Sequence, residues 1–395
     1  MNTFDANTQP IDPTVHHPSH RHLLKTPVGI LPHAGVDAVI VPAARPAECL
    51  KDAFTLAQKV GTGVVAMCSG AVTAEQAVAL GDTEDVPVIA VDVRNDADGL
   101  PTFSTTELLQ RHPEFARPSD TSRKRNLALN LSRLAGWERV LFLDDDIYDV
   151  DPEGVQVAAG LLGEFGAVGL NNVGCPDNSV VCHVLGTLGP DLGPDGAIPG
   201  EQAQFIGIGG MAVSPTTSYS FFPNIYNQDW FFIMGMGDEL RVAVTGLMKQ
   251  QRYKPFEDPD RARREELGDC LAEGLFWLLD HGLPLNRADV DHWREFLGRR
   301  AFFIGCLSDE IANRKLDRAK AERIQASLAK AWNTLKKIEP DLCVEYVDRW
   351  RADLDTWRSF LDERPVSLEG GLDAALEYVR WDGVVRSSVP WPTSL

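Results

Sequence analysis

The sequence lacks a long apolar run, an excess of positive charge and any C-x-x-C pair of cysteines. No segment approaches the ~18 apolar residues that a membrane-spanning helix needs, and the first residues lack the apolar core of a signal peptide. The seven cysteines are odd in number, and several lie in apolar runs, which favours reduced, buried thiols. We therefore expect a cytoplasmic protein with no integral membrane segment.

Positive charge is scarce, because 38 Lys and Arg residues face 57 Asp and Glu residues, which gives a net charge of −19. This balance argues against nucleic acid or an anionic membrane as the main partner. A phosphate-bearing substrate remains compatible with it, since a few local cations or a metal ion can reverse the field at one site. The 395 residues suffice for two domains, or for one domain with an added subdomain.

The most informative stretch is 140–146, in which four apolar residues lead directly into three carboxylates. The apolar part is typical of a buried strand of a parallel sheet, and open α/β sheets bind ligands at the carboxyl ends of such strands. Clustered carboxylates repel one another and lose hydration there. A divalent cation with substrate phosphates would relieve both penalties, which predicts a metal–diphosphate site at Asp144 and Asp146. The alternative is a helix N-terminus capped by Asp149 or Asp151.

Three β-α units precede this stretch in close succession. Strands are expected over 37–42, 63–68 and 86–91, and the helix after the second opens with a Thr73-x-x-Gln76 capping box. This alternation predicts a doubly wound, parallel sheet. The strand ends bring candidate ligand-binding residues to one rim, namely Ala43, Arg45, Ser69 and Asp92.

Residues 93–121 carry three prolines and no clear periodicity, and a helix is expected over 122–135. Three basic residues in succession, Arg123 to Arg125, fall in its first turn, where cations are unfavourable. Two explanations stay open: an anionic ligand nearby, which would make Lys124 and Arg125 candidate phosphate contacts, or a solvated basic face.

Residues 1–34 are polar, rich in proline and aperiodic, which predicts a mobile N-terminal tail. Its histidines could bind a metal, but they have no rigid frame. We therefore favour a solvated tail for this cluster, which consists of His16, His17, His20 and His22.

The middle of the chain is rich in glycine. Residues 171–203 predict a long loop, of the kind that forms a lid or a binding loop or is disordered, and the glycines of the strand expected over 205–213 indicate close approach by a backbone or a ligand. Asp229 lies among aromatic residues, where the pKa of a carboxyl group rises and suits a general base. A helix cap or a hydrogen bond to backbone is an equally open role for Asp229.

The C-terminal part of the chain has a helical pattern. After one more strand over 241–248, a helix over 261–279 carries an acidic face that we interpret as solvated, and the pattern stays helical from 290 to 361. The predicted division is a tail over 1–34, an α/β domain over 35–285 and a helical C-terminal subdomain over 286–395.

The order of these features resembles the GT-A class of nucleotide-sugar glycosyltransferases, and most closely family 2, over residues 35–256. The matching pieces are the β-α start, Lys124-x-Asn126 before an Ala/Leu helix, Leu143-Asp-Asp-Asp146 as the D-x-D motif, the Gly209-Gly210-Met211 strand, and Asn227-Gln228-Asp229-Trp230 where the family usually has a Glu-Asp pair. The resemblance implies a GT-A-like, doubly wound, mostly parallel sheet with the helical subdomain appended at its C-terminal side.

The resemblance also implies transfer of a sugar, with inversion, from a nucleotide diphosphate sugar to a hydroxyl of a small molecule, a glycan or another acceptor. Mg²⁺ or Mn²⁺ at Asp144 and Asp146 would neutralise the leaving diphosphate, and Asp229 would be the base at an oxocarbenium-like transition state. The implied donor-binding residues are Ala43, Arg45, Ser69, Asp92, Lys124, Arg125, Asn126, Asp144 and Asp145. The implied acceptor-binding residues are Gly209, Gly210, Met211 and Trp230.

Three positions depart from the family pattern. Cys68-Ser69 ends the second strand, where the family often has a nucleobase-binding Asp, Gln228 replaces a Glu, and 248–252 contains no His that could be a further metal ligand. Two alternatives remain: a nucleotidyltransferase, although Ala43-Ala44-Arg45 lacks the glycines of its usual loop, and a non-catalytic nucleotide-binding or scaffold protein on a decayed transferase fold.

Overall fold

The computed structural model describes residues 20, 23–93, 99–173, 179–188, 207–237 and 240–392. These residues divide into two compact units. The sheet unit comprises the described residues within 22–175, 204–253 and 346–395. The helical unit comprises the described residues within 1–21, 176–203 and 254–345.

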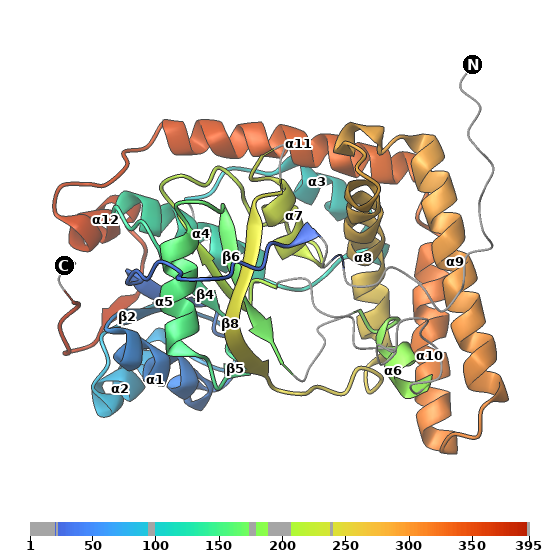
Figure 1. Ribbon diagram of the computed structural model, residues 1–395, viewed down its shortest axis with the longest axis horizontal. Helices are drawn as coiled ribbons and strands as arrows, with labels where there is room; N and C mark the ends of the chain where they lie inside the picture. Colours follow the sequence, from blue (N-terminus) through green and yellow to red (C-terminus); the bar gives the residue numbers. More distant parts are fainter. Residues whose placement is uncertain are drawn as a thin grey trace. The chain divides into compact units, whose positions relative to one another are not determined.

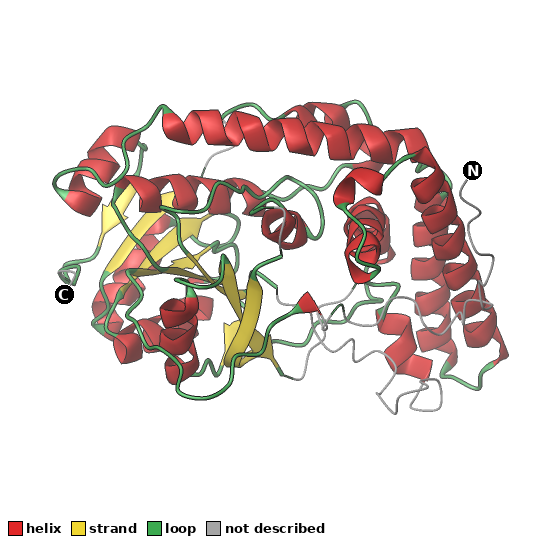
Figure 2. Ribbon diagram, turned by 45° about the horizontal axis from the view of Figure 1, so that its top comes forward, coloured by secondary structure: helices red, strands yellow, loops and turns green. Residues whose placement is uncertain are grey.

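The strands of the described chain all belong to the sheet unit (Figures 1 and 2), and they are β1 (Ala38–Val41), β2 (Gly63–Cys68), β3 (Val88–Asp92), β4 (Val140–Leu143), β5 (Ile147–Tyr148), β6 (Ala167–Asn172), β7 (Gly210–Val213), β8 (Val242–Gln250) and β9 (Val384–Arg386). The helices of this unit are η2 (Ala47–Leu50), α1 (Lys51–Val60), α2 (Ala74–Glu84), α3 (Ser104–Gln110), η3 (Pro113–Phe115), α4 (Thr121–Leu134), α5 (Pro152–Leu161), α7 (Gln228–Met234) and α12 (Gly371–Val379). The helical unit contains α6 (His183–Leu188), α8 (Pro259–Asp280), η5 (Leu285–Arg287), α9 (Val290–Asn313) and α10 (Arg318–Leu335), and α11 (Pro340–Asp362) has residues in both units.

The described strands form one mixed sheet of nine strands in the order β5-β8-β6-β7-β4-β1-β2-β3-β9. Strands β1 to β4, β6 and β8 run in one direction, while β5, β7 and β9 are antiparallel to their neighbours. The prediction of an α/β protein with a mostly parallel sheet is therefore confirmed. Because β1, β2 and β4 are parallel neighbours, their carboxyl ends meet at one edge of the sheet.

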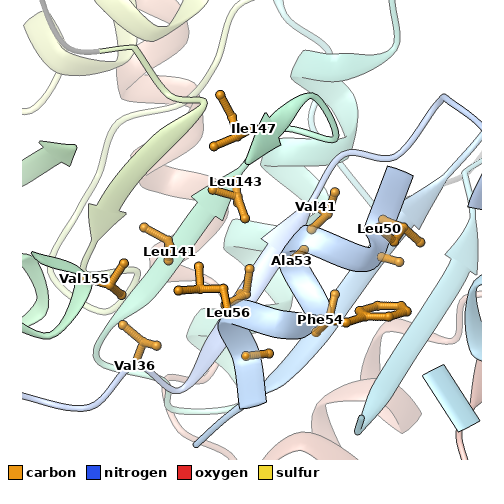
Figure 3. Close-up of a cluster of buried hydrophobic side chains, with 14 of the residues drawn as sticks. Val36, Val41, Leu50, Ala53, Phe54, Leu56, Leu141, Leu143, Ile147 and Val155 are labelled. Carbon is orange, nitrogen blue, oxygen red and sulfur yellow. The ribbon is translucent and has the colours of Figure 1, made fainter. Parts of the chain in front are cut away.

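Helices α1, α2 and α5 pack on one face of this sheet. Figure 3 shows Leu141 and Leu143 of β4 beside Ala53 and Leu56 of α1, within a cluster that is almost fully buried. Phe142, between the two leucines, points to the opposite face and meets Phe222 with ring centroids 5.6 Å apart. Burial of both faces explains why β4 is an uninterrupted apolar run.

Two helix starts follow their local signals. The Thr73 hydroxyl accepts from the Gln76 N–H and the Gln76 side chain accepts from the Thr73 N–H, which completes the predicted capping box. The Asp151 carboxylate accepts from the Glu153 N–H at 3.1 Å, so the predicted cap of α5 is also confirmed. Since Asp151 fills the cap, residues 144–146 are left for another role.

The expectation of an irregular segment over 93–121 is wrong for part of its length, because the chain forms α3 and η3 there. Helix α3 is capped from a distance: the Ser104 and Thr105 N–H groups donate to the carboxylate of Asp353 at 2.7 and 2.9 Å. That carboxylate belongs to α11, so the neighbouring sequence carries no signal for this cap. The expected loop over 171–203 begins with the last two residues of β6 and contains α6. Residues 174–178 and 189–203 of this loop lie outside the described residues.

The acidic face of α8 is buried, which contradicts the prediction of a solvated face. Glu265, Glu266, Asp269 and Glu273 are each 4% exposed or less. The guanidinium of Arg300, itself 0% exposed, donates to both oxygens of Glu266 at 2.9 and 3.0 Å and to Asp269 at 2.5 Å. Buried carboxylates persist only when such partners replace water.

His20 is likewise buried rather than solvated, so the favoured interpretation of the histidine cluster is wrong for this residue. One ring nitrogen bonds Asp280 and the other lies 3.3 Å from Glu273, and the ring packs 5.0 Å from that of Phe276. Burial by itself would lower the pKa of His20, but the two carboxylates outweigh burial and raise that pKa to about 9. The other three histidines lie outside the described residues.

The two units differ from the predicted division at 34 and 285. The helical unit takes in α8, and residues 346–395 belong to the sheet unit, where the Val384–Arg386 strand pairs with β3. Changes in composition along the chain could not reveal that residues 346–395 belong to the sheet unit, because this depends on the pairing of β9 with the distant β3.

Candidate functional site

The carboxylate triplet lies at the carboxyl end of β4, as predicted. Asp144, Asp145 and Asp146 are partly buried, with side chains 30, 12 and 14% exposed. The Asp144 N–H donates to Gly209 O at 3.1 Å, and the Ile147 N–H returns to Asp144 O. The turn holds the three carboxylates next to the end of β1, the parallel neighbour of β4.

Each carboxylate of the triplet has different partners. Asp144 accepts from Arg125 Nη2 at 2.6 Å, and Asp146 accepts from Arg45 Nη2 at 3.1 Å. Asp145 accepts from the backbone N–H groups of Ala44 and Arg45 at 2.8 and 3.0 Å. Asp145 therefore fixes the loop that follows β1. Ala43, a predicted donor-binding residue at the start of this loop, is buried.

Burial raises the pKa of Asp146, the negative charge of Asp144 raises it further, and Arg45 opposes both. A desolvated carboxylate beside a second one is a place where added positive charge is favourable. The pair fits Mg²⁺ or Mn²⁺ of the kind that binds one or two protein carboxylates together with water and phosphates. It does not fit an all-protein cage, because no group of three or more His, Cys, Asp or Glu side chains suited to a metal occurs in the described part of the chain.

Arg125 connects the triplet to the predicted base. Its side chain is only 4% exposed and its guanidinium lies 5.7 Å from the centre of the Phe222 ring. Asp229, in the first turn of α7, is partly buried, and its Oδ2 accepts from the Ile208 N–H at 3.2 Å. Burial raises the pKa of Asp229, and the nearby charge of Arg125 opposes that rise. The structure thus groups Asp144, Arg125 and Asp229.

Residues 207–209, which lead into β7, lie against this group. A Cβ at Gly207 would lie 3.4 Å from Asp229 Oδ2, and one at Gly209 would lie 3.3 Å from Asp144 Oδ2. Both glycines bring the backbone close to the carboxylates, but they lie in the turn before β7, so the strand expected over 205–213 is shorter than predicted within the described residues.

Lys124 and Asn126 are used by the fold. Lys124 Nζ donates to Ala43 O at 2.8 Å and to Ser69 Oγ at 2.5 Å, and it lies 3.3 Å from Asp120. Asn126 pairs with both the N–H and the C=O of Phe222. The explanation of the basic turn as a solvated face is therefore wrong for Lys124, which is 1% exposed and joins α4 to the ends of β1 and β2. A phosphate contact by Lys124 stays a prediction. Burial lowers the pKa of Lys124.

The remaining predicted residues are dispersed. Asp92 Oδ1 accepts from the Ala74 N–H at 2.8 Å, which anchors the start of α2. Gly210 and Met211 are buried in β7. Trp230 follows Asp229 in α7 and stays partly exposed.

Two glutamines of the site were missed by sequence reasoning. Gln250 Nε2 donates to Asp146 Oδ2 at 3.3 Å, and Gln251 Oε1 accepts from Arg45 Nη1 at 3.3 Å. They lie at the end of β8 and directly after it, within residues 248–252, where a metal-binding His was sought by analogy with GT-A enzymes. Position in the chain was the available signal, since an amide side chain carries no motif of its own.

A polar cavity of about 530 Å³ lies beside the start of α4. Asn126 and Phe222 line it and Phe222 also contacts Arg125, so this wall is shared with the carboxylate group. Hydroxyl, amide and charged groups form most of the remaining lining, among them Thr106, Glu107 and Arg123.

No helix in the described part of the chain is long and apolar enough to cross a membrane. The six cysteines within the described ranges are free, and four of them are buried, as the sequence predicts for reduced thiols. Comparison with known proteins adds no family: no protein-family model matches the chain, and no curated protein matches it significantly.

Proposed function

We propose that the sheet unit is a glycosyltransferase that moves a sugar from a nucleotide diphosphate sugar to an acceptor hydroxyl. The observation that carries the proposal is the grouping of Asp144 and Asp146 with two arginines and with Asp229 at one edge of the sheet. A nucleotide diphosphate needs cationic partners, and a hydroxyl nucleophile needs a base. The resemblance of the motif order to GT-A enzymes supports the same reaction.

In the proposed reaction Asp229 accepts the proton of the acceptor hydroxyl. The acceptor oxygen forms a bond to the anomeric carbon, the bond from that carbon to the diphosphate oxygen breaks, and the diphosphate leaves with the electron pair. The raised pKa of Asp229 suits proton uptake near neutral pH. Arg45 and Arg125 lie where they can bind the phosphate oxygens.

Asp144 and Asp146 would hold Mg²⁺ or Mn²⁺, which would supply charge neutralisation of the leaving diphosphate. The polar cavity beside α4 has the volume and the hydrogen-bonding groups for a hydroxyl-rich ligand.

The test is nucleotide binding and turnover in matched Asp→Asn variants. Wild type is titrated with UDP, GDP, ADP, CDP and dTDP in the presence of Mn²⁺, followed by thermal shift, where a nucleotide at 100 times its Kd stabilises by about 2.7 kcal/mol. We expect one of them to bind and Asp146→Asn to lose that binding. Asp149→Asn is the control, because Asp149 lies in the same segment but is 65% exposed and bonds Lys249.

Asp229→Asn separates binding from chemistry. It should retain nucleotide binding and reduce hydrolysis or transfer of the matching nucleotide sugar by about 10²–10⁴-fold, the usual share of a general base. Full turnover in this variant would remove Asp229 from the mechanism. Absence of binding for every nucleotide, with folded protein, would contradict the donor site and favour a non-catalytic role.

A further inference from the structure

Arg45 pairs with Asp146, one of the two carboxylates that would bind the divalent cation in the proposed function. Its Nη2 donates to Asp146 Oδ2 at 3.1 Å and its Nε lies 3.5 Å from Asp145 Oδ1. The positive charge of Arg45 opposes the rise in the pKa of Asp146, so the pair interacts electrostatically as well as by contact.

The backbone and the side chain of Arg45 are held very differently. Its N–H is fixed by Asp145 at 3.0 Å, next to a second bond from Ala44. Its side chain is 42% exposed, whereas the side chains of Asp145 and Asp146 are 12 and 14% exposed. The guanidinium therefore can move into solvent while the loop stays in place, and the carboxylates cannot.

We infer that Arg45 is an exchangeable counter-ion: without ligand it neutralises Asp146, and with a nucleotide diphosphate bound it pairs with the phosphates instead. This inference rests on the proposed function. A guanidinium is suited to both roles, because carboxylate and phosphate oxygens accept from its fork in the same way. Arg45 and a divalent cation would then compete for Asp146, and Gln251, which accepts from Nη1, would hold the guanidinium within reach of both positions.

The inference predicts effects of opposite sign in one variant, Arg45→Gln. Mn²⁺ alone, followed by the electron paramagnetic resonance signal of the free ion, should bind the variant about 3- to 10-fold more tightly, since a competing charge of the strength of a partly exposed ion pair is removed. The nucleoside diphosphate that binds wild type should bind the variant about 10-fold more weakly in saturating Mn²⁺, because one charged phosphate contact is lost.

Arg139→Gln is the matched control. Arg139 also has its N–H fixed by a carboxylate, Asp37 at 2.9 Å, its side chain is 39% exposed, and it pairs with Glu138. It precedes β4, at the opposite end of the strand from the triplet. The control removes the same charge and should leave both affinities unchanged.

The outcomes separate this inference from the proposed function. Unchanged or weaker Mn²⁺ binding in Arg45→Gln, with binding retained by wild type, would overturn the exchange. Tighter Mn²⁺ binding that disappears in Arg45→Gln/Asp146→Asn, with no nucleoside diphosphate bound by any variant, would support competition for Asp146 and contradict the donor site. No Mn²⁺ binding by wild type or Arg45→Gln would overturn both.

Discussion

Replacement of His20 should remove a pH-dependent part of the stability of the helical unit. His20 is 1% exposed and its ring lies between Asp280 and Glu273. Burial opposes its charge, yet the two carboxylates raise its pKa from 6.5 to about 9. At about 1.4 kcal/mol per pKa unit, this difference corresponds to about 3 kcal/mol of stability.

The sign follows from which state binds the proton more tightly. Because the pKa of His20 is higher in the folded protein, its contribution is fully present below about pH 6.5 and is lost as the pH rises through about 9. Buried thiols add a second loss at high pH, since burial raises the pKa of Cys68 and of Cys182 to about 12, while unfolded thiols ionise near pH 8.5. That loss is common to every variant, so the difference between variants isolates His20.

Urea unfolding of wild type and His20→Gln between pH 6 and pH 9.5 measures this difference. We expect wild type to exceed the variant at pH 6 by about 3 kcal/mol more than at pH 9.5. His33→Gln is the control, because the His33 side chain is 52% exposed and lies 3.9 Å from Glu153. A difference between wild type and His20→Gln that stays constant across this range would refute the charged pairing of His20.

Two further substitutions test packing. Arg300→Met leaves Glu266 and Asp269 buried without their shared cation and should cost about 3–5 kcal/mol in urea unfolding, and a loss below 1 kcal/mol would indicate that water reaches these carboxylates. Gly63→Ala places a Cβ 2.6 Å from the Trp391 ring and should cost about 1–3 kcal/mol and change near-ultraviolet circular dichroism, whereas unchanged spectra would show that the ring does not pack there.

Local patterns predicted the parts of the fold that local contacts determine. The apolar run of β4 and the capping box at Thr73 are examples, since strand burial and a helix cap each depend on neighbouring residues. The sheet class followed from the same patterns. The cap of α3 did not, because its carboxylate, Asp353, comes from a segment about 250 residues later in the chain.

The candidate site was predictable in position but not in the role of each residue. A triplet of Asp after a buried strand marks the edge of the sheet, and no pattern distinguishes Asp145, which holds the loop, from Asp146, which faces a guanidinium. The prediction of a solvated acidic face on α8 was wrong for a related reason. A run of acidic residues is typical of a solvated face, and the burial depends on partners from other elements, such as Arg300 of α9.

Burial and bond count separate the cations of this site more clearly than charge does. Lys124 is 1% exposed and contacts Ala43, Ser69 and Asp120, so a ligand could gain it only by breaking the junction between α4 and two strands. The side chain of Arg45 is 42% exposed. The loop that carries Arg45 is held by its backbone N–H, which donates to Asp145, and not by its guanidinium. A ligand that pairs with Arg45 therefore breaks few contacts of the fold, whereas a ligand that pairs with Lys124 breaks several. For this reason we expect Arg45 at the strand exit, rather than Lys124 of the basic helix turn, to be the cation that a phosphate takes over.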